Sequence, residues 1–163
     1  MIGFFAALLI AQGALAPSVT VVDQLGRSKS APSAQKPVLV IYEDQDGGKE
    51  NQHAKQVIGR INSSAANQAK IDVLPVANLE KWDWWPARKY ALADIRKKAA
   101  AQRTTIYLDW KGQVRKAWDL PKGHSSLILL GTDGKVRFSS EGELSAARLK
   151  ELLALLASLG LTI

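Results

Sequence analysis

The residues of this chain that are best placed for chemistry lie in a short acidic turn, Glu43–Gly48, with the sequence EDQDGG. The turn follows an apolar run, Val38–Tyr42, and precedes a predicted helix. Such a junction offers free backbone amides and the positive end of a helix dipole, which can stabilise a reactive thiolate. The chain contains no cysteine, so disulfide formation, thiol–disulfide exchange, cysteine peroxidase chemistry and cysteine-ligated zinc are excluded.

The carboxylates of this turn allow four other uses. Asp46 or a neighbour can cap the following helix, which is worth about 0.5–2 kcal/mol. The pattern Asp44-x-Asp46-Gly47 resembles part of a calcium loop, but the remaining ligands and the closing Glu are not at the required spacing, so no metal is predicted. An acidic patch that meets a partner is the third use. Acid–base catalysis by Glu43, Asp44, Asp46 and His124 is the fourth, and it forms the enzymatic alternative.

The two histidines, His53 and His124, carry no recognisable site of their own. Neither has a second ligand at zinc spacing. His124 precedes Ser125 and Ser126, but adjacent residues rarely face each other productively, and the chain has no Gly-x-Ser-x-Gly elbow. A hydrolase is therefore not favoured, and no cofactor is predicted.

The segment KWDWWPARK, Lys81–Lys89, carries three tryptophans within four residues. One interpretation is that one or two of them pack on the core. The other is a surface for a peptide, glycan or protein partner, because Trp and Arg dominate binding hot spots. The residues predicted for this partner surface are Trp82, Trp84, Trp85 and Arg88.

The segment Lys81–Arg103 holds seven basic and two acidic residues, a net charge of +5 within a chain whose formal charge is +7. Such a run is typical of a solvated helix face, and it also allows a peripheral contact with an anionic membrane surface. Stacking aromatics are sparse along it and no recognition motif appears, so nucleic-acid binding is not favoured.

These residues are positioned by elements that the sequence pattern predicts along 163 residues. Strands are expected at 18–25, 38–42 and 70–79, where Pro75 favours an edge position or an early strand end. Helices are expected at 49–66 and 86–102, and residues 26–37 form a loop. A further strand, a Lys-Gly turn, and then a second strand or extended arm lead to Trp118. The segment 126–138 predicts a hairpin, and a last helix begins at Ser145 and ends at Gly160.

The order β, β-α-β, α, β, β-hairpin, α predicts an α/β protein of thioredoxin-like fold, with a central mixed β-sheet flanked by helices. The expected organisation is a single domain at 17–163. Residues 1–16 are interpreted as a signal peptide or an apolar N-terminal segment, because an apolar run leads to the small-x-small pattern Ala14-x-Ala16. Export would follow, although no Lys or Arg precedes the apolar run.

The C-terminal third resembles the YtfJ-type family of periplasmic thioredoxin-like proteins. The resemblance rests on a Gly-x-Val-x-x-x-Trp turn, a Ser-Ser pair before an apolar strand, an Asp-Gly-x-Val turn, and Gly-x-Leu before the last helix. In this chain these are Gly112, Val114, Trp118, Ser125, Ser126, Asp133, Gly134, Val136, Gly142 and Leu144. The resemblance implies a thioredoxin-like fold, a periplasmic location and no settled activity.

Redox-active proteins of this fold place a cis-proline just before the hairpin strand, beside the cysteine turn. This chain has Ser125 or Ser126 there, and Pro121 lies too early, so both halves of a redox site are missing. The favoured hypothesis is therefore a redox-inactive binding or accessory protein that holds a protein or peptide partner. Its predicted groove lies between EDQDGG and PKGHSS and comprises Asp44, Asp46, Gly47, Gly48, His124 and Ser125.

Overall fold

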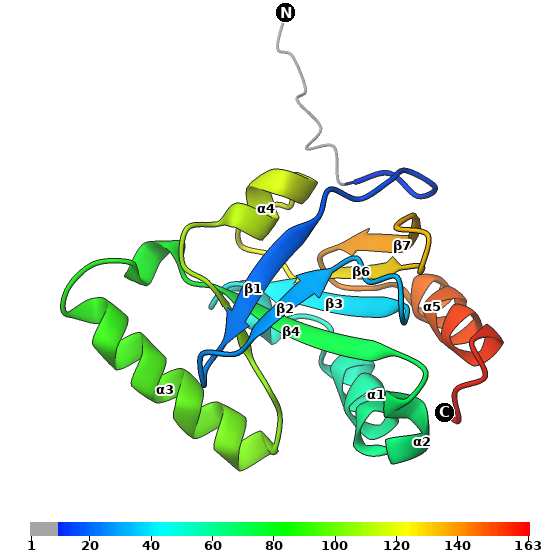
Figure 1. The fold of residues 1–163 in the computed structure, drawn as a ribbon, viewed down its shortest axis with the longest axis horizontal. Coiled ribbons are helices and arrows are strands. Elements are labelled where there is room, and N and C mark those ends of the chain that lie inside the picture. Colours follow the sequence, from blue (N-terminus) through cyan, green and yellow to red (C-terminus); the bar gives the residue numbers. More distant parts are fainter. Residues whose placement is uncertain (1–9) are drawn as a thin grey trace, which may run out of the picture.

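The computed structural model describes residues 10–163, which form a seven-stranded mixed sheet with helices on both faces (Figure 1). The strand order is β2-β1-β5-β4-β3-β6-β7. Strands β3, β4 and β5 are mutually parallel, and the other neighbouring pairs are antiparallel. The strands are β1 (Val19–Asp23), β2 (Ser28–Ala31), β3 (Val38–Glu43), β4 (Asp72–Asn78), β5 (Tyr107–Asp109), β6 (Ser126–Leu130) and β7 (Val136–Glu141).

The helices follow the predicted order, with one addition. The α-helices are α1 (Gln52–Ser63), α2 (Ala65–Gln68), α3 (Ala87–Gln102), α4 (Gln113–Trp118) and α5 (Ala146–Ser158), and the short 3₁₀ turns are η1 (Gly47–Lys49) and η2 (Glu80–Trp82). Ser145 caps α5 as predicted, because its hydroxyl accepts a hydrogen bond from the Arg148 amide. Gly160, with a φ of +76°, follows the end of that helix.

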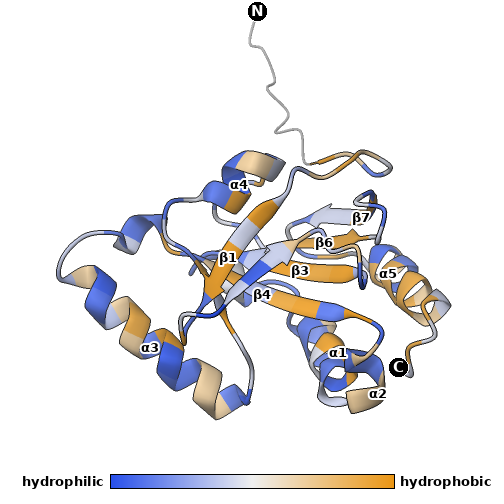
Figure 2. Ribbon diagram, in the orientation of Figure 1, coloured by the Kyte–Doolittle hydropathy of each residue, from blue (hydrophilic) through white to orange (hydrophobic). Residues whose placement is uncertain are grey.

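The apolar strand β3 lies in the interior of the sheet, between β4 and β6. Residues 38–42 of β3 are all buried, as expected for a strand that is covered on both faces. Figure 2 shows β3 and β6 as strongly hydrophobic strands, whereas β7 at the edge of the sheet is less hydrophobic. The carboxyl end of β3 therefore brings the acidic turn to the carboxyl edge of the parallel strands.

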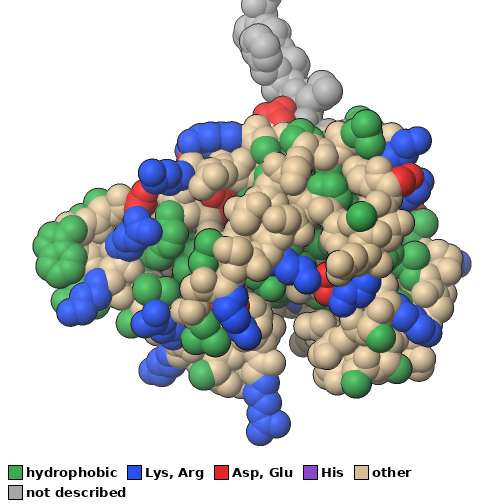
Figure 3. Space-filling view, viewed as in Figure 1, with side chains coloured by type: hydrophobic (Ala, Val, Ile, Leu, Met, Phe, Trp, Pro, Cys, Tyr) green, Lys and Arg blue, Asp and Glu red, His purple; other side chains and the backbone are tan. Residues whose placement is uncertain are grey.

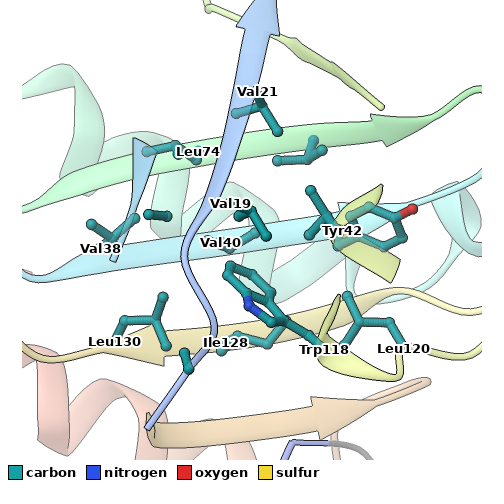
Figure 4. Packing of buried hydrophobic residues seen from close by; sticks show 14 of the residues in the cluster. Val19, Val21, Val38, Val40, Tyr42, Leu74, Trp118, Leu120, Ile128 and Leu130 are labelled. Carbon is teal, nitrogen blue, oxygen red and sulfur yellow. The ribbon is translucent and has the colours of Figure 1, made fainter. Parts of the chain in front are cut away.

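Two hydrophobic clusters cover the two faces of the sheet. On one face α1 and α5 pack against β3, β6 and β7, and Leu152 and Leu156 of α5 are fully buried. On the other face Trp118 of α4 packs with Val19, Val40 and Ile128, and the chain around Val19 crosses above β3 and β6 (Figure 4). The helix α3 belongs to neither cluster and lies at one end of the molecule, away from α1 and α5 (Figure 1).

Three predicted details are wrong. Pro75 does not mark an edge strand, because β4 lies between β3 and β5; Pro75 pairs with Ile41 of β3, and β5 begins to pair only at Val76. Pro75 has no backbone N–H to donate, and this is tolerated because at this position β4 is paired only with β3 and not yet with β5. The loop 26–37 contains the short polar strand β2, which forms one edge of the sheet.

The third correction concerns the segment before Trp118, which is the helix α4 and not an extended arm. The side chain of Asp109 accepts hydrogen bonds from the amides of Gln113 and Val114, at 2.7 and 3.0 Å, and so satisfies the free amides that begin the helix. Val114 and Trp118 are four residues apart and both buried, which is helical spacing.

The predicted signal peptide lies partly outside the described residues, which begin at residue 10. Residues 10–16 are described, and Ala16 is buried in the hydrophobic cluster that contains Trp118. Within residues 10–163, no helix has the length and apolar character needed to cross a bilayer.

Candidate functional site

Asp44 organises the acidic turn at the carboxyl end of β3. One of its carboxylate oxygens accepts hydrogen bonds from the amides of Asp46 and Gly47, at 3.1 and 2.9 Å. The other accepts from the amide of Gly123, at 2.7 Å, in the loop before β6. Asp44 therefore binds the amides at the start of η1. The expected cap of the following α-helix is wrong, because the N-cap residue of α1 is Asn51, whose side chain makes no capping hydrogen bond. The side chain of Asp46 points instead to Lys81, at 3.2 Å.

Glu50 and His124 form a second link between the same two segments. One Glu50 oxygen accepts a hydrogen bond from the Ser125 amide at 2.7 Å, and the other lies 2.9 Å from His124 Nδ1. The Ser125 amide, helped by His124, lowers the pKa of Glu50. The hydrogen bond with Glu50 in turn raises the pKa of His124. Charged Glu50 and protonated His124 therefore stabilise each other.

Gly47 brings the two segments into direct contact. A Cβ atom at this position would lie only 2.3 Å from the carbonyl carbon of His124 and 2.7 Å from the Ser125 nitrogen. At Gly48, by contrast, the nearest atom is a Glu43 carboxylate oxygen 3.8 Å away. The sequence expectation that glycine shapes this turn is therefore specific to Gly47, where the requirement is close approach of two backbones.

The six residues predicted for a groove are thus gathered at one place. Asp44, Gly47, His124 and Ser125 lie together at the junction. Asp46 and Gly48 lie on the same turn, where the Asp46 side chain pairs with Lys81 and the Gly48 carbonyl oxygen accepts hydrogen bonds from Gln52 and Lys55. The open space lies beside this junction, as a small hollow of about 30 Å³. Its lining residues are Asp44, Gln45, Asn78, Glu80, Lys81, Trp82 and Lys122.

A buried polar network lies under this hollow, and sequence reasoning missed it. The Tyr42 hydroxyl donates to Asp109 at 2.9 Å, and burial, reinforced by the Asp109 charge, raises the pKa of Tyr42. Arg115 of α4 donates to both oxygens of Glu80, at 2.8 and 3.2 Å, which lowers the pKa of Glu80 to about 2. The one sequence signal for this network was Asp109, four residues before the first amide that it caps.

The predicted partner surface forms a separate exposed region at the start of α3. The exposed fractions of Trp82, Trp84 and Trp85 are 37%, 57% and 77%. Trp82 is the last residue of η2, and Trp84 and Trp85 follow it before α3 begins. Core packing of these residues is thus minor, and the interpretation of a surface aromatic cluster fits their exposure.

The side chains of this surface are held in place by neighbouring groups. The Trp84 indole N–H donates to the carbonyl oxygen of Lys81 at 3.1 Å. Arg88 pairs with Asp83 at 2.7 Å and stacks 4.5 Å above the centre of the Trp110 ring. They border a shallow hollow of about 450 Å³ lined by Asp83, Trp84, Trp85, Arg88, Lys89 and Leu92. Figure 3 shows hydrophobic side chains beside Lys and Arg side chains over this end of the molecule.

The chemical capacity of the acidic turn is limited by these contacts. All four oxygens of Asp44 and Glu50 have hydrogen-bond partners in the fold, and Glu43 pairs with Lys55 at 3.0 Å. The Ser125 hydroxyl is completely buried. Within residues 10–163, no cluster of three His, Asp or Glu side chains is arranged to hold a metal ion. The junction is built as a structural link between β3, α1 and the loop before β6.

The family model described as "Bacterial protein of unknown function (YtfJ_HI0045)" matches residues 87–159. This stretch includes every residue, from Gly112 to Leu144, on which the resemblance to the YtfJ-type family rested, and the resemblance is confirmed over it. No curated protein matches the chain in sequence.

Solved structures confirm the predicted thioredoxin-like fold. The thioredoxin domain of a thiol-disulfide oxidoreductase from Bacteroides vulgatus aligns with a TM-score of 0.62 and 18% identity, over 89% of this chain and 96% of its own. StoA from Bacillus subtilis aligns with a TM-score of 0.61 and 18% identity, over 86% and 98%. Peroxidoxin BcpB from Mycobacterium tuberculosis aligns with a TM-score of 0.61 and 18% identity, over 91% and 97%. At these identities the likeness shows the fold alone.

Proposed function

We propose that this YtfJ-type, thioredoxin-like chain is a redox-inactive accessory protein that binds a partner protein through the surface of Trp82, Trp84, Trp85 and Arg88. The absence of cysteine removes thiol chemistry from a fold whose solved neighbours include thiol-disulfide oxidoreductases. The scaffold then serves as a rigid frame that positions a recognition surface.

The observation that carries this proposal is the exposure of two adjacent tryptophans, Trp84 and Trp85. Trp84 and Trp85 leave most of their large apolar area in water, which is unfavourable unless a partner covers it. Trp84 and Arg88 are already held by Lys81, Asp83 and Trp110, so a partner would pay little conformational entropy to order them. Trp and Arg are also the side chains that contribute most to binding hot spots.

The acidic turn has a supporting role in this proposal. The salt bridge between Asp46 and Lys81 joins the turn to the segment that carries the tryptophans. A partner that covers Trp82 would also meet the small hollow beside Asp44 and Lys122. The groove residues would then form the edge of the interface and not its centre.

A periplasmic location is part of the proposal. The apolar run before Ala11 and the Ala14-x-Ala16 pattern support export. Acid–base catalysis by Glu43, Asp44, Asp46 and His124 is the less favoured alternative, because these side chains are engaged in ion pairs and hydrogen bonds within the fold.

The proposal is tested by a crosslinking pull-down from periplasmic extract with the wild-type chain and the double variant Trp84→Ala/Trp85→Ala. Loss of the two exposed rings is expected to remove the partner, with little change in the thermal midpoint. Ile163→Ala is the matched control, because Ile163 is an exposed apolar residue at the opposite end of the molecule (Figure 1). The proposal is wrong if the double variant captures the same proteins as the control.

A further inference from the structure

The N-terminal segment 10–16 lies against the β6–β7 hairpin and forms backbone hydrogen bonds with it. The Gly13 amide donates to the carbonyl oxygen of Val136 at 2.7 Å, and the Val136 amide donates to that of Ala14 at 2.9 Å. The Ala16 amide donates to the carbonyl oxygen of Gly134 at 2.9 Å. Leu15 faces Lys135 in an antiparallel bridge. The segment is therefore held on the hairpin by backbone hydrogen bonds and a single bridge, and it turns at Ala11–Ala14, where the Ala14 amide donates to the carbonyl oxygen of Ala11 at 3.0 Å.

This contact covers a sheet edge that would otherwise be open. β7 is the last strand of the sheet, so the backbone groups on its outer side have no partner strand within the sheet. Exposed edges of this kind accept an added strand from another chain segment. Here the start of β7 and the turn before it are paired with residues of the same chain.

Few side chains of residues 10–16 contact the rest of the protein. Ala16 is buried in the hydrophobic cluster that contains Trp118, and Ile10 packs half-buried against the same cluster, while Leu15 is 68% exposed. One further polar contact reaches beyond the bridge, from the Gln12 side-chain amide to the carbonyl oxygen of Arg137 at 2.8 Å. Recognition therefore rests on backbone hydrogen bonds with a small residue at position 16.

We propose that the outer edge of residues 134–137 is a docking site for a peptide that binds through its backbone amides, and that residues 10–16 are its intramolecular occupant. The site is distinct from the surface of Trp82, Trp84, Trp85 and Arg88, and it does not depend on the function proposed for that surface. Cleavage after Ala16, as the Ala14-x-Ala16 pattern predicts, would release the occupant and open the edge. The Pro17 carbonyl would stay bound to the Trp118 indole N–H, at 2.8 Å, and would keep β1 in place.

A variant of the full chain tests this site without truncation. In Gly13→Pro/Ala16→Pro, both donor amides are removed, and the φ of +88° at Gly13 is not available to proline. The segment is expected to leave the edge, while the thermal midpoint of the domain stays within a few degrees. The probe is a fluorescein-labelled synthetic peptide with the sequence of residues 10–16, followed by anisotropy.

The peptide is expected to bind the double variant at least tenfold more tightly than it binds the wild-type chain. A peptide N-methylated at the positions of Gly13 and Ala16 is the matched control and is expected to lose that binding, because it lacks the two donors. No binding to the variant, or equal binding to variant and wild type, would overturn the proposal.

Hydrogen exchange at Val136 gives a second readout that does not depend on the peptide. Its amide donates to Ala14 in the wild-type chain, so it is expected to exchange slowly there and at least tenfold faster in the double variant. Saturating peptide is expected to restore the protection. Fast exchange at Val136 in the wild-type chain would show that residues 10–16 do not occupy the edge.

Discussion

At the scale of single residues, Gly47 is the position where the fold leaves no space for a side chain. Gly47→Ala would place a Cβ atom 2.3 Å from the His124 carbonyl carbon. Either the acidic turn or the loop before β6 must then move, although the two are joined by hydrogen bonds. We expect a loss of about 1–3 kcal/mol in the free energy of unfolding, measured by urea denaturation. The control is Gly48→Ala, whose Cβ would meet nothing closer than 3.8 Å and whose cost is expected within about 0.5 kcal/mol. Equal costs for the two variants would contradict the close approach.

The pair of Glu50 and His124 predicts a defined pH dependence. The folded pKa of Glu50 is below its ordinary value of 4.5, so its contribution is present above pH 4.5 and is lost as the pH falls through the folded pKa. The folded pKa of His124 is above 6.5, so its contribution is present below pH 6.5 and is lost as the pH rises through the folded pKa. The stability difference between wild type and Glu50→Gln should therefore be largest between pH 4.5 and 6.5.

This difference is measured by denaturation at a series of pH values, together with NMR titration of His124 in both proteins. The pKa of His124 is expected to be lower in Glu50→Gln than in the wild type, because the carboxylate is its main stabilising partner. An unchanged His124 pKa would mean that the 2.9 Å contact is not formed in solution.

The residue types alone indicated where the acidic turn lies, but not which of its carboxylates binds the backbone amides of the neighbouring loop. Asp44 and Asp46 are equivalent in sequence, and only the position of the loop 121–125 makes Asp44 the one that binds Gly123. Glu50 was not selected because its partner, Ser125, is 75 residues away in the chain. Contacts of this kind depend on tertiary packing and have no local signal.

At the scale of elements, Tyr42 joins β3 to the loop that starts α4. Its hydroxyl is buried, and it donates to Asp109, which also binds the first amides of that helix. Tyr42→Phe is expected to cost about 1.5–3 kcal/mol in the free energy of unfolding, because a buried hydrogen bond to a carboxylate is lost. Tyr90→Phe is the matched control and is expected to be nearly neutral, since Tyr90 is 70% exposed. A neutral Tyr42→Phe would mean that the network contributes nothing to stability.

Elements with a clear pattern of apolar residues could be predicted from the sequence, whereas elements without such a pattern could not. The run Val38–Tyr42, the hairpin of β6 and β7, and the capped helix α5 follow directly from pattern and turn chemistry. The strand β2 was missed because it is short, polar and paired on one side only. Helix α4 was missed because Val114 and Trp118 were assigned to an extended arm, although their spacing of four residues is helical.

At the scale of the whole molecule, the sheet and its two clusters form a scaffold, and the exposed tryptophans lie outside both clusters. The helix α3 projects at one end of the molecule (Figure 1). The carboxyl edge, where redox relatives of this fold would place a thiol, is closed here by Asp44, Gly47 and Glu50. The proposed binding function centres the partner on the exposed tryptophans and not on the carboxyl edge.

The central claim is tested most directly by site-specific photo-crosslinking. A benzophenone amino acid replaces Trp85 in one protein and Lys150, an exposed residue of α5, in another. We expect a discrete crosslinked protein from position 85 in periplasmic extract, and its yield should fall when Trp84→Ala is added. No comparable product is expected from position 150. The account is contradicted if positions 85 and 150 give the same products, or if Trp84→Ala leaves the yield at position 85 unchanged.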